Sequence, residues 1–123
     1  MRAKSKKTAK QDREIRKERN EFKAEFYICM RCQTALATDC HEIARGSYRH
    51  IAKMERVAWL CLCPECHEHM GDYSEWPLSR QLALKLLRDP QHFNLKRINE
   101  IRGRADTGIL MFEVVKWLDM ATY

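Results

Sequence analysis

The chain has 123 residues, 45% hydrophobic and 33% charged, enough for one small domain with a thin core that needs a metal or cross-link for stability. The formal net charge is +6, which favours an anionic partner. The charged N-terminus does not resemble a secretory signal, and Lys116 and Asp119 interrupt the most apolar stretch, so we expect neither export nor a membrane-spanning helix.

The excess positive charge lies in an N-terminal arm. Residues 1–19 contain nine Lys/Arg against three Asp/Glu, so this segment carries the whole net charge of +6. A basic arm on a neutral body is typical of proteins that contact nucleic-acid phosphates, and a solvated, partly frayed helix is the alternative. The expected phosphate contacts in the arm are Lys4, Lys6, Lys7, Lys10 and Arg13.

The first half of the chain predicts a helix, a turn and a strand. Residues 13–26 place sparse apolar side chains at helical spacing, which indicates a helix with a narrow buried face. The segment from Cys29 to Cys32 predicts a tight metal-binding turn, and a strand leading into His41 should follow. Residues 45–47, Arg-Gly-Ser, then break the regular structure.

The second half predicts one strand and a series of helices. Residues 57–63 are a compact apolar run, Pro64 ends that strand, and a helix should begin at Glu65. A leucine-rich helix should start near residues 76–77 and stop at 89–90, followed by a short helix ending near Gly103 and an amphipathic helix over 109–120. We therefore divide the chain into a basic arm (1–26), a core (27–76) and a helical extension packed on the core (77–123).

Two Cys-x-x-Cys units, Cys29–Cys32 and Cys63–Cys66, predict a structural zinc site. In a reducing compartment such paired units are metal ligands more often than disulfides, and four thiolates hold zinc tetrahedrally. Cys61 offers a second register for the later pair, but the matched spacing favours Cys63 with Cys66. Cys40 and Cys61 then become small buried apolar side chains.

The segment around these units resembles a known family. The run Cys-x-x-Cys, then His41-Glu42-Ile43 with a following glycine, then Leu-Cys-x-x-Cys-His67, resembles the HNH nuclease superfamily between residues 27 and 70. The closest resemblance is to zinc-knuckle members from phages and prophages, some of them similar to recombination endonucleases. This implies a small α+β fold whose ββα-metal core holds one catalytic divalent ion, with the four-cysteine zinc clamping it and helices on both sides.

The resemblance also implies site residues. His41 and His67 match the family's metal-ligand positions, Glu42 stands where the general-base histidine is usual, and Arg56 stands near the expected asparagine. On a plainer interpretation, His41 is a core-edge histidine and His67 is a helix residue or a replacement zinc ligand. His69 is the reserve ligand, and His50 and His92 should lie at the surface.

The two departures from the family pattern affect the expected chemistry. A carboxylate at Glu42 accepts a proton from water less readily than histidine at neutral pH, and Arg56 cannot bind a metal but can pair with the scissile phosphate. Asp39 is the candidate additional carboxylate for a magnesium, manganese or other divalent ion. Arg45, Arg49 and Lys53 add expected phosphate contacts on the loop side.

These observations predict a metal-dependent DNA endonuclease, or a nuclease-derived recombination protein, encoded by a phage or prophage and acting in the bacterial cytoplasm. The alternative is a catalytically inactive, zinc-stabilised nucleic-acid-binding module. A third interpretation is a zinc-stapled adaptor that docks other proteins through its C-terminal helices. None of the three involves a membrane.

Overall fold

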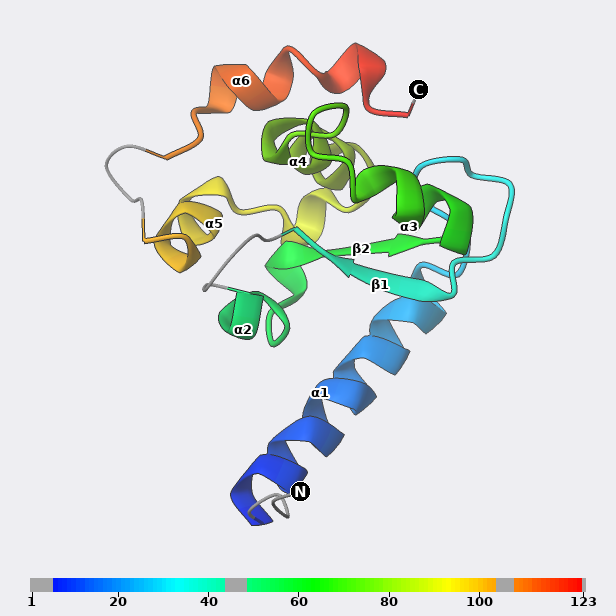
Figure 1. The fold of residues 1–123 in the computed structure, drawn as a ribbon, viewed down its shortest axis with the longest axis vertical. Helices are drawn as coiled ribbons and strands as arrows, with labels where there is room; N and C mark the ends of the chain where they lie inside the picture. The colour runs from blue at the N-terminus through cyan, green and yellow to red at the C-terminus, as the bar shows by residue number, and fades with distance from the viewer. Residues whose placement is uncertain (1–5, 44–48, 104–107, 123) are drawn as a thin grey trace.

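The computed structural model describes residues 6–43, 49–103 and 108–122 and shows a small α+β fold (Figure 1). Its α-helices are α1 (Lys6–Glu25), α2 (Arg49–Ala52), α3 (Pro64–Met70), α4 (Leu78–Arg88), α5 (Leu95–Ile101) and α6 (Met111–Val115). The strands are β1 (Asp39–Glu42) and β2 (Trp59–Leu62), and the short 3-10 turns are η2 (Arg56–Ala58), η3 (Pro90–His92) and η4 (Leu118–Met120).

The two strands form an antiparallel sheet that is followed directly by α3. In its register His41 lies opposite Leu60 and Cys40 lies opposite Cys61. Every residue of β2 is buried, because this strand lies between the rest of the core and β1, whereas most of β1 is only half-buried. Helix α3 contacts both strands, so the chain runs strand, strand, helix around one small centre.

Helix α1 joins the body through its C-terminal half and extends away from it toward the N-terminus (Figure 1). Phe22 is fully buried, and its ring centroid lies 5.6 Å from that of Trp59 and 5.0 Å from that of Phe26. The helix begins at Lys6, seven residues before the predicted start, because straight-chain Lys, Arg, Glu and Gln residues continue a helix without needing a buried face.

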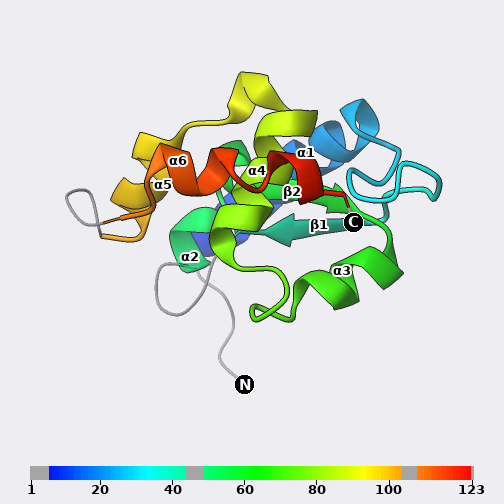
Figure 2. The ribbon, with the colours of Figure 1, turned by 90° about the horizontal axis from the view of Figure 1, so that it is seen from above.

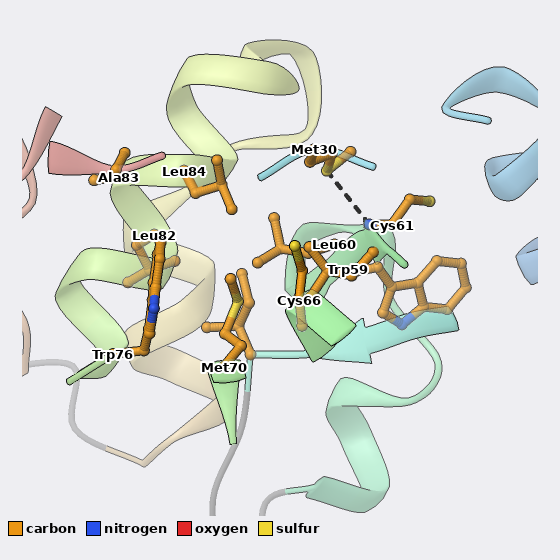
Figure 3. Packing of buried hydrophobic residues seen from close by; sticks show 14 of the residues in the cluster. Met30, Trp59, Leu60, Cys61, Cys66, Met70, Trp76, Leu82, Ala83 and Leu84 are labelled. Atoms are coloured by element: carbon orange, nitrogen blue, oxygen red, sulfur yellow. Dashed lines mark hydrogen bonds between the residues drawn. The ribbon is translucent and has the colours of Figure 1, made fainter. Parts of the chain in front are cut away.

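Helix α4 lies at the centre of the C-terminal half. Figure 3 shows Leu82 and Leu84 of this helix among the core side chains, together with Trp76. Seen from above, α6 crosses over α4 (Figure 2), and Arg80 ties the end of the chain to α4 by donating to the carbonyl oxygen of Met120 at 2.9 Å. The C-terminal extension is therefore packed onto the core.

Two predicted elements differ from the structure. The strand expected over 57–63 is shorter, because residues 56–58 form a 3-10 turn before β2 begins at Trp59. The single helix expected over 109–120 is wrong, since α6 ends at Val115 and a separate turn follows at 118–120. β-branched Val114 and Val115 disfavour a longer helix, and Trp117 turns toward Arg80, 5.4 Å from its guanidinium. Among the described residues, no helix is long and apolar enough to cross a membrane.

Candidate metal centres

The four predicted cysteines gather at one place. The ligand atoms of Cys29, Cys32, Cys63 and Cys66 all lie within 4.8 Å of one another. Zinc–sulfur bonds of about 2.3 Å in a tetrahedron separate the sulfurs by roughly 3.8 Å, so a small inward movement would complete a zinc site. The structure therefore brings the four predicted cysteines into one cluster that is compatible with a structural zinc, with Cys63 rather than Cys61 beside Cys66.

The turn that presents the first pair depends on Gln33. Its backbone φ is 59°, in the left-handed region, and its backbone amide donates to the carbonyl oxygen of Cys29 at 2.9 Å. The Gln33 side chain donates to the same carbonyl at 2.9 Å. These bonds close the chain into a tight loop that points the Cys29 and Cys32 sulfurs to the same side. On the other side, Cys63 precedes α3 and Cys66 lies in its first turn.

Polar neighbours support thiolates at this cluster. Hydrogen bonds from the Thr34 side chain and backbone lower the pKa of Cys32 to about 6. Burial raises the pKa of Cys66 to about 12, although Arg31 opposes this by donating to its sulfur at 3.4 Å. A bound zinc ion deprotonates coordinating thiols outright, so Arg31 would then offset the negative charge of the thiolate cluster.

Cys40 and Cys61 lie outside the cluster, opposite each other on the two strands. Burial raises the pKa of the Cys40 thiol to about 11 and that of Cys61 to about 12. Both therefore remain protonated, weakly reactive thiols at neutral pH, as expected for small apolar side chains.

A second group of polar side chains lies on the other side of the strand pair and α3. The rings of His41, in β1, and His67, in α3, approach edge to face with centroids 5.1 Å apart. They line a pocket of about 410 Å³. The residues around that pocket are Arg19, Cys40, His41, Glu42, Arg49, His67, Gly71 and Tyr73.

The proton position on His41 follows from its hydrogen bonds. Nε2 of His41 lies 2.8 Å from Oε1 of Gln81, while Nε2 of Gln81 donates to the carbonyl oxygen of Trp76 at 2.8 Å. Because the amide nitrogen is engaged by Trp76, the amide oxygen faces His41 and must accept, which assigns the proton to Nε2. Burial lowers the pKa of His41 to about 4, so the ring is neutral and Nδ1 keeps its lone pair.

His67 has the complementary arrangement. Its Nδ1 lies 2.9 Å from Oδ2 of Asp39, whose other oxygen accepts from the Thr38 hydroxyl at 3.2 Å. The carboxylate accepts this hydrogen bond and holds the His67 ring through Nδ1. Each histidine thus has one nitrogen hydrogen-bonded to a neighbouring side chain, as metal-ligating imidazoles usually have. Asp39 supports His67 in this geometry, and its expected role as a direct ligand stays a prediction.

Glu42 lies between two arginines at the rim of the pocket. Its Oε1 is 2.5 Å from the guanidinium of Arg19 in α1, and its Oε2 is 4.0 Å from that of Arg49. Arg19 also donates to the carbonyl oxygen of Lys53 at 3.1 Å and lies 5.2 Å from the Trp59 ring centroid. A carboxylate, two guanidinium groups and two imidazoles therefore line one pocket.

Arg56 lies elsewhere. Its guanidinium pairs with three glutamates of α1, at 3.0, 3.6 and 3.7 Å from Glu18, Glu21 and Glu25, and it is not among the residues lining the histidine pocket. Its expected contact with a scissile phosphate stays a prediction, although the described contacts assign it to holding α1.

The expected phosphate contacts are spread over several elements. Lys10 and Arg13 are exposed on α1, and Arg49 and Lys53 are exposed at and after α2. Lys4 and Arg45 lie outside the described residues, and only the backbone is described for Lys6 and Lys7.

Four of the residues that line the pocket, namely Arg19, Cys40, Gly71 and Tyr73, were not assigned to this site by sequence analysis, nor was Gln81, which bonds to His41 without lining the pocket. Gln81 is fully buried on α4, and no spacing rule connects it with a histidine forty positions earlier. In the sequence analysis, Arg19 was considered only as part of the positive charge of the N-terminal arm. His92, expected at the surface, is half-buried, and its Nδ1 lies 2.9 Å from the Asp89 carboxylate.

Within the described ranges, the four cysteines are the one set of three or more potential metal ligands whose donor atoms converge this closely. The two histidines do not form such a group with a third potential ligand among the described side chains. No family model, curated protein or solved structure matches this chain, so its function is argued from these two centres.

Proposed function

We propose that this protein is a metal-dependent DNA endonuclease of the HNH-like kind, whose His41 and His67 hold a catalytic divalent ion. The observation that carries the proposal is that the two imidazoles line one pocket with their ring centroids 5.1 Å apart, each with one nitrogen hydrogen-bonded to a side chain, Gln81 or Asp39. Two strands and a helix supply them in the order that the sequence resemblance implies.

The pocket contains the other groups that phosphodiester hydrolysis needs. A divalent ion, magnesium or manganese among the candidates, would supply Lewis acidity toward a phosphate oxygen there. Glu42 is the group positioned to accept the proton of the attacking water, and Arg49 is placed to pair with the phosphate. His41 and His67 would hold the ion, while Gln81 and Asp39 orient the two histidines through hydrogen bonds.

The four-cysteine cluster serves this site indirectly. It is compatible with a structural zinc that joins the turn before β1 to the start of α3. Since β1 carries His41 and α3 carries His67, zinc at the cluster would fix the relative position of the two histidines. We retain the association with phage or prophage recombination in a bacterial cytoplasm as part of the proposal, on the sequence resemblance alone.

A plasmid-nicking assay tests the activity. Wild-type protein is incubated with supercoiled plasmid in the presence of magnesium, of manganese or of no added divalent ion, beside His41→Ala and His67→Ala variants. His69→Ala is the matched control, because His69 is exposed on α3 and does not line the pocket. We expect metal-dependent nicking by wild type and the His69→Ala protein only. Nicking that survives both pocket substitutions would exclude the proposed site.

One observation favours a second function. Both oxygens of Glu42 face arginines in the structure, so the carboxylate that would have to contact an attacking water is already engaged by other side chains. A protein in which that pairing persists would be a zinc-stabilised nucleic-acid-binding module without catalysis. DNA binding by wild type without nicking under any metal condition would select this function.

A further inference from the structure

Apolar, acidic and basic side chains lie on different sides of helix α1. At 3.6 residues per turn, positions three, four and seven apart share one side, and between residues 15 and 26 each side carries one kind of residue. The apolar side is Ile15, Phe22 and Phe26, the acidic side is Glu18, Glu21 and Glu25, and the basic side is Arg16, Arg19 and Lys23.

Two of these sides are engaged by the body of the protein. Phe22 is fully buried against Trp59, and the three glutamates pair with Arg56, which precedes β2. Contacts on two adjacent sides fix the rotation of the helix about its axis. The basic side consequently faces in one direction, toward α2 and the end of β1.

On that side the structure has a groove of about 410 Å³, which we call the α1 groove. Its lining contains four cationic side chains and two carboxylates, with the cations contributed by α1 and by the residue after α2. The lining residues are Asp12, Ile15, Arg16, Arg19, Asn20, Lys23, Glu42 and Lys53.

The four cations of the α1 groove outnumber its two carboxylates, Asp12 and Glu42, which leaves a net charge of +2. Glu42 is neutralised by Arg19 at 2.5 Å. Within the described part of the chain, the side chains of Arg16, Lys23 and Lys53 make no ion pair, and Arg16 and Lys53 are exposed. Three cations on the wall of a groove, without partners of their own, form a site for an extended anion.

The α1 groove adjoins the histidine pocket. Arg19 and Glu42, which form an ion pair, line both. The seven-residue step from Arg16 to Lys23 spans about 10 Å along the helix axis, roughly the rise of three phosphates along one DNA strand. The ligand that matches is a chain of phosphates rather than a single anion.

We propose that the α1 groove binds the sugar–phosphate backbone of the DNA and leads it to the pocket of His41 and His67. The identity of the partner rests on the proposed function, but the groove itself is a separate surface whose binding needs no divalent ion. The assignment adds Arg16 and Lys23 to the contacts expected from the arm. In this assignment Arg19 has two anionic partners, Glu42 and a DNA phosphate, because a phosphate in the groove would lie next to the guanidinium group that pairs with Glu42.

The test compares two double variants of the full chain with equal loss of charge. Arg16→Gln with Lys23→Gln removes two cations from the groove. Lys17→Gln with Lys96→Gln removes two exposed cations outside it, Lys17 on another side of α1 and Lys96 on α5. Affinity for a short mixed-sequence DNA duplex is measured by fluorescence anisotropy against salt concentration, without divalent ions, after zinc content and the unfolding midpoint have been matched to wild type.

We expect the slope of log affinity against log salt to fall by nearly 2 for the groove variant, since each phosphate contact contributes about 0.9. Its affinity at moderate salt should fall about tenfold or more, while the control variant keeps the wild-type slope. Equal salt slopes for all three proteins, or equal losses of DNA affinity in the two variants, would contradict DNA binding in the α1 groove.

Two further outcomes separate the groove from its partner and from catalysis. Polyglutamate is tested as a competing ligand at the same salt concentration. If it binds wild type as tightly as DNA does, and if the groove variant loses affinity for it to the same extent, the partner is an acidic protein and the proposal is overturned. Nicking is scored independently. If the groove variant has a smaller salt slope but wild type never nicks plasmid, the result supports DNA binding in the α1 groove and rejects the nuclease. If wild type nicks and all salt slopes are equal, the result supports the nuclease and rejects DNA binding in the groove.

Discussion

Nε2 of His41 lies 2.8 Å from Oε1 of Gln81, and this contact joins the strand pair to a helix forty residues later in the chain. Gln81 is fully buried and is itself fixed by its bond to the carbonyl oxygen of Trp76. The C-terminal extension therefore completes the candidate site, because the segment from β1 to α3 does not by itself determine which nitrogen of His41 carries the proton.

Replacing Gln81 by leucine should weaken both the fold and the site. The buried Nε2–H of His41 and the carbonyl of Trp76 would lose their partner, at a cost of about 1–3 kcal/mol in the free energy of unfolding. His41 would also lose its fixed tautomer, so metal-dependent nicking should fall by roughly 10- to 100-fold. Urea unfolding and the plasmid assay measure the two effects. Gln91→Leu, at an exposed position, is the control, and an active, equally stable Gln81→Leu protein would refute the assigned role.

Zinc binding should depend on the four clustered cysteines and not on Cys40 or Cys61. Cys29→Ser or Cys66→Ser should abolish stoichiometric zinc and unfold the domain, since a structural zinc supplies about 10–16 kcal/mol, as much as a small domain's whole stability. Cys40→Ala with Cys61→Ala should keep one zinc per chain and lose only about 1–2 kcal/mol from smaller side chains in the core. Elemental analysis and thermal unfolding distinguish the sets, and zinc loss in the second variant would place those thiols at the metal.

The features that sequence reasoning found were local ones. Two residues between cysteines suffice to form a turn that aims both sulfurs at one ion, so Cys29 with Cys32 and Cys63 with Cys66 could be identified from spacing alone. The strands before His41 and before Cys63 followed from short apolar runs ending at turn residues. The strand–strand–helix order was therefore predictable together with the zinc ligands.

The features that it missed depend on tertiary packing. Gln81 looks like any polar residue in a leucine-rich helix, and only the packing of α4 against the strands turns it toward His41. Arg56 was assigned by its position relative to a family pattern, whereas the docking of α1 supplies three carboxylates that bind it. The charge separation around α1 was visible in the sequence, but which side would face the pocket depended on where Phe22 is buried.

Acid should weaken the contact between Glu55 and Arg97. Arg97 Nε donates to Glu55 Oε1 at 2.7 Å, and this hydrogen bond holds the pKa of Glu55 below its ordinary value of 4.5. The unfolded chain then binds the proton more readily, so the stabilisation is complete above about pH 4.5 and is lost as the pH falls through the folded-state pKa. Both side chains are exposed to solvent, which screens the pair and keeps the coupling energy small.

A double-mutant cycle isolates that coupling from acid effects on the cysteines. Wild type, Glu55→Gln, Arg97→Gln and the double variant are unfolded with urea at a series of pH values from neutral downward. The coupling energy should be constant near neutrality and vanish in acid. A coupling that persists below pH 3, or grows there, would contradict the assignment.

Arg56 offers the sharpest choice between the sequence-based expectation and the structure. In the structure it pairs with Glu18, Glu21 and Glu25, and its guanidinium lies 5.8 Å from the Phe22 ring centroid, so it fastens α1 to the body. Arg56→Gln should therefore cost about 1–2 kcal/mol of unfolding free energy, with high salt reducing the loss because the glutamates are half-exposed.

The same substitution should leave the rate of nicking nearly unchanged well below the unfolding midpoint. Glu18→Gln with Glu21→Gln is the matched variant, since it removes two of the three Arg56 contacts from the other side and should destabilise α1 to a similar extent. Its effect should not add fully to that of Arg56→Gln, because both changes break the same pairs. If Arg56 instead contacts the scissile phosphate, Arg56→Gln will lose nicking at wild-type stability while the glutamate variant stays active. Measuring unfolding and nicking on the same three preparations therefore decides between the two roles.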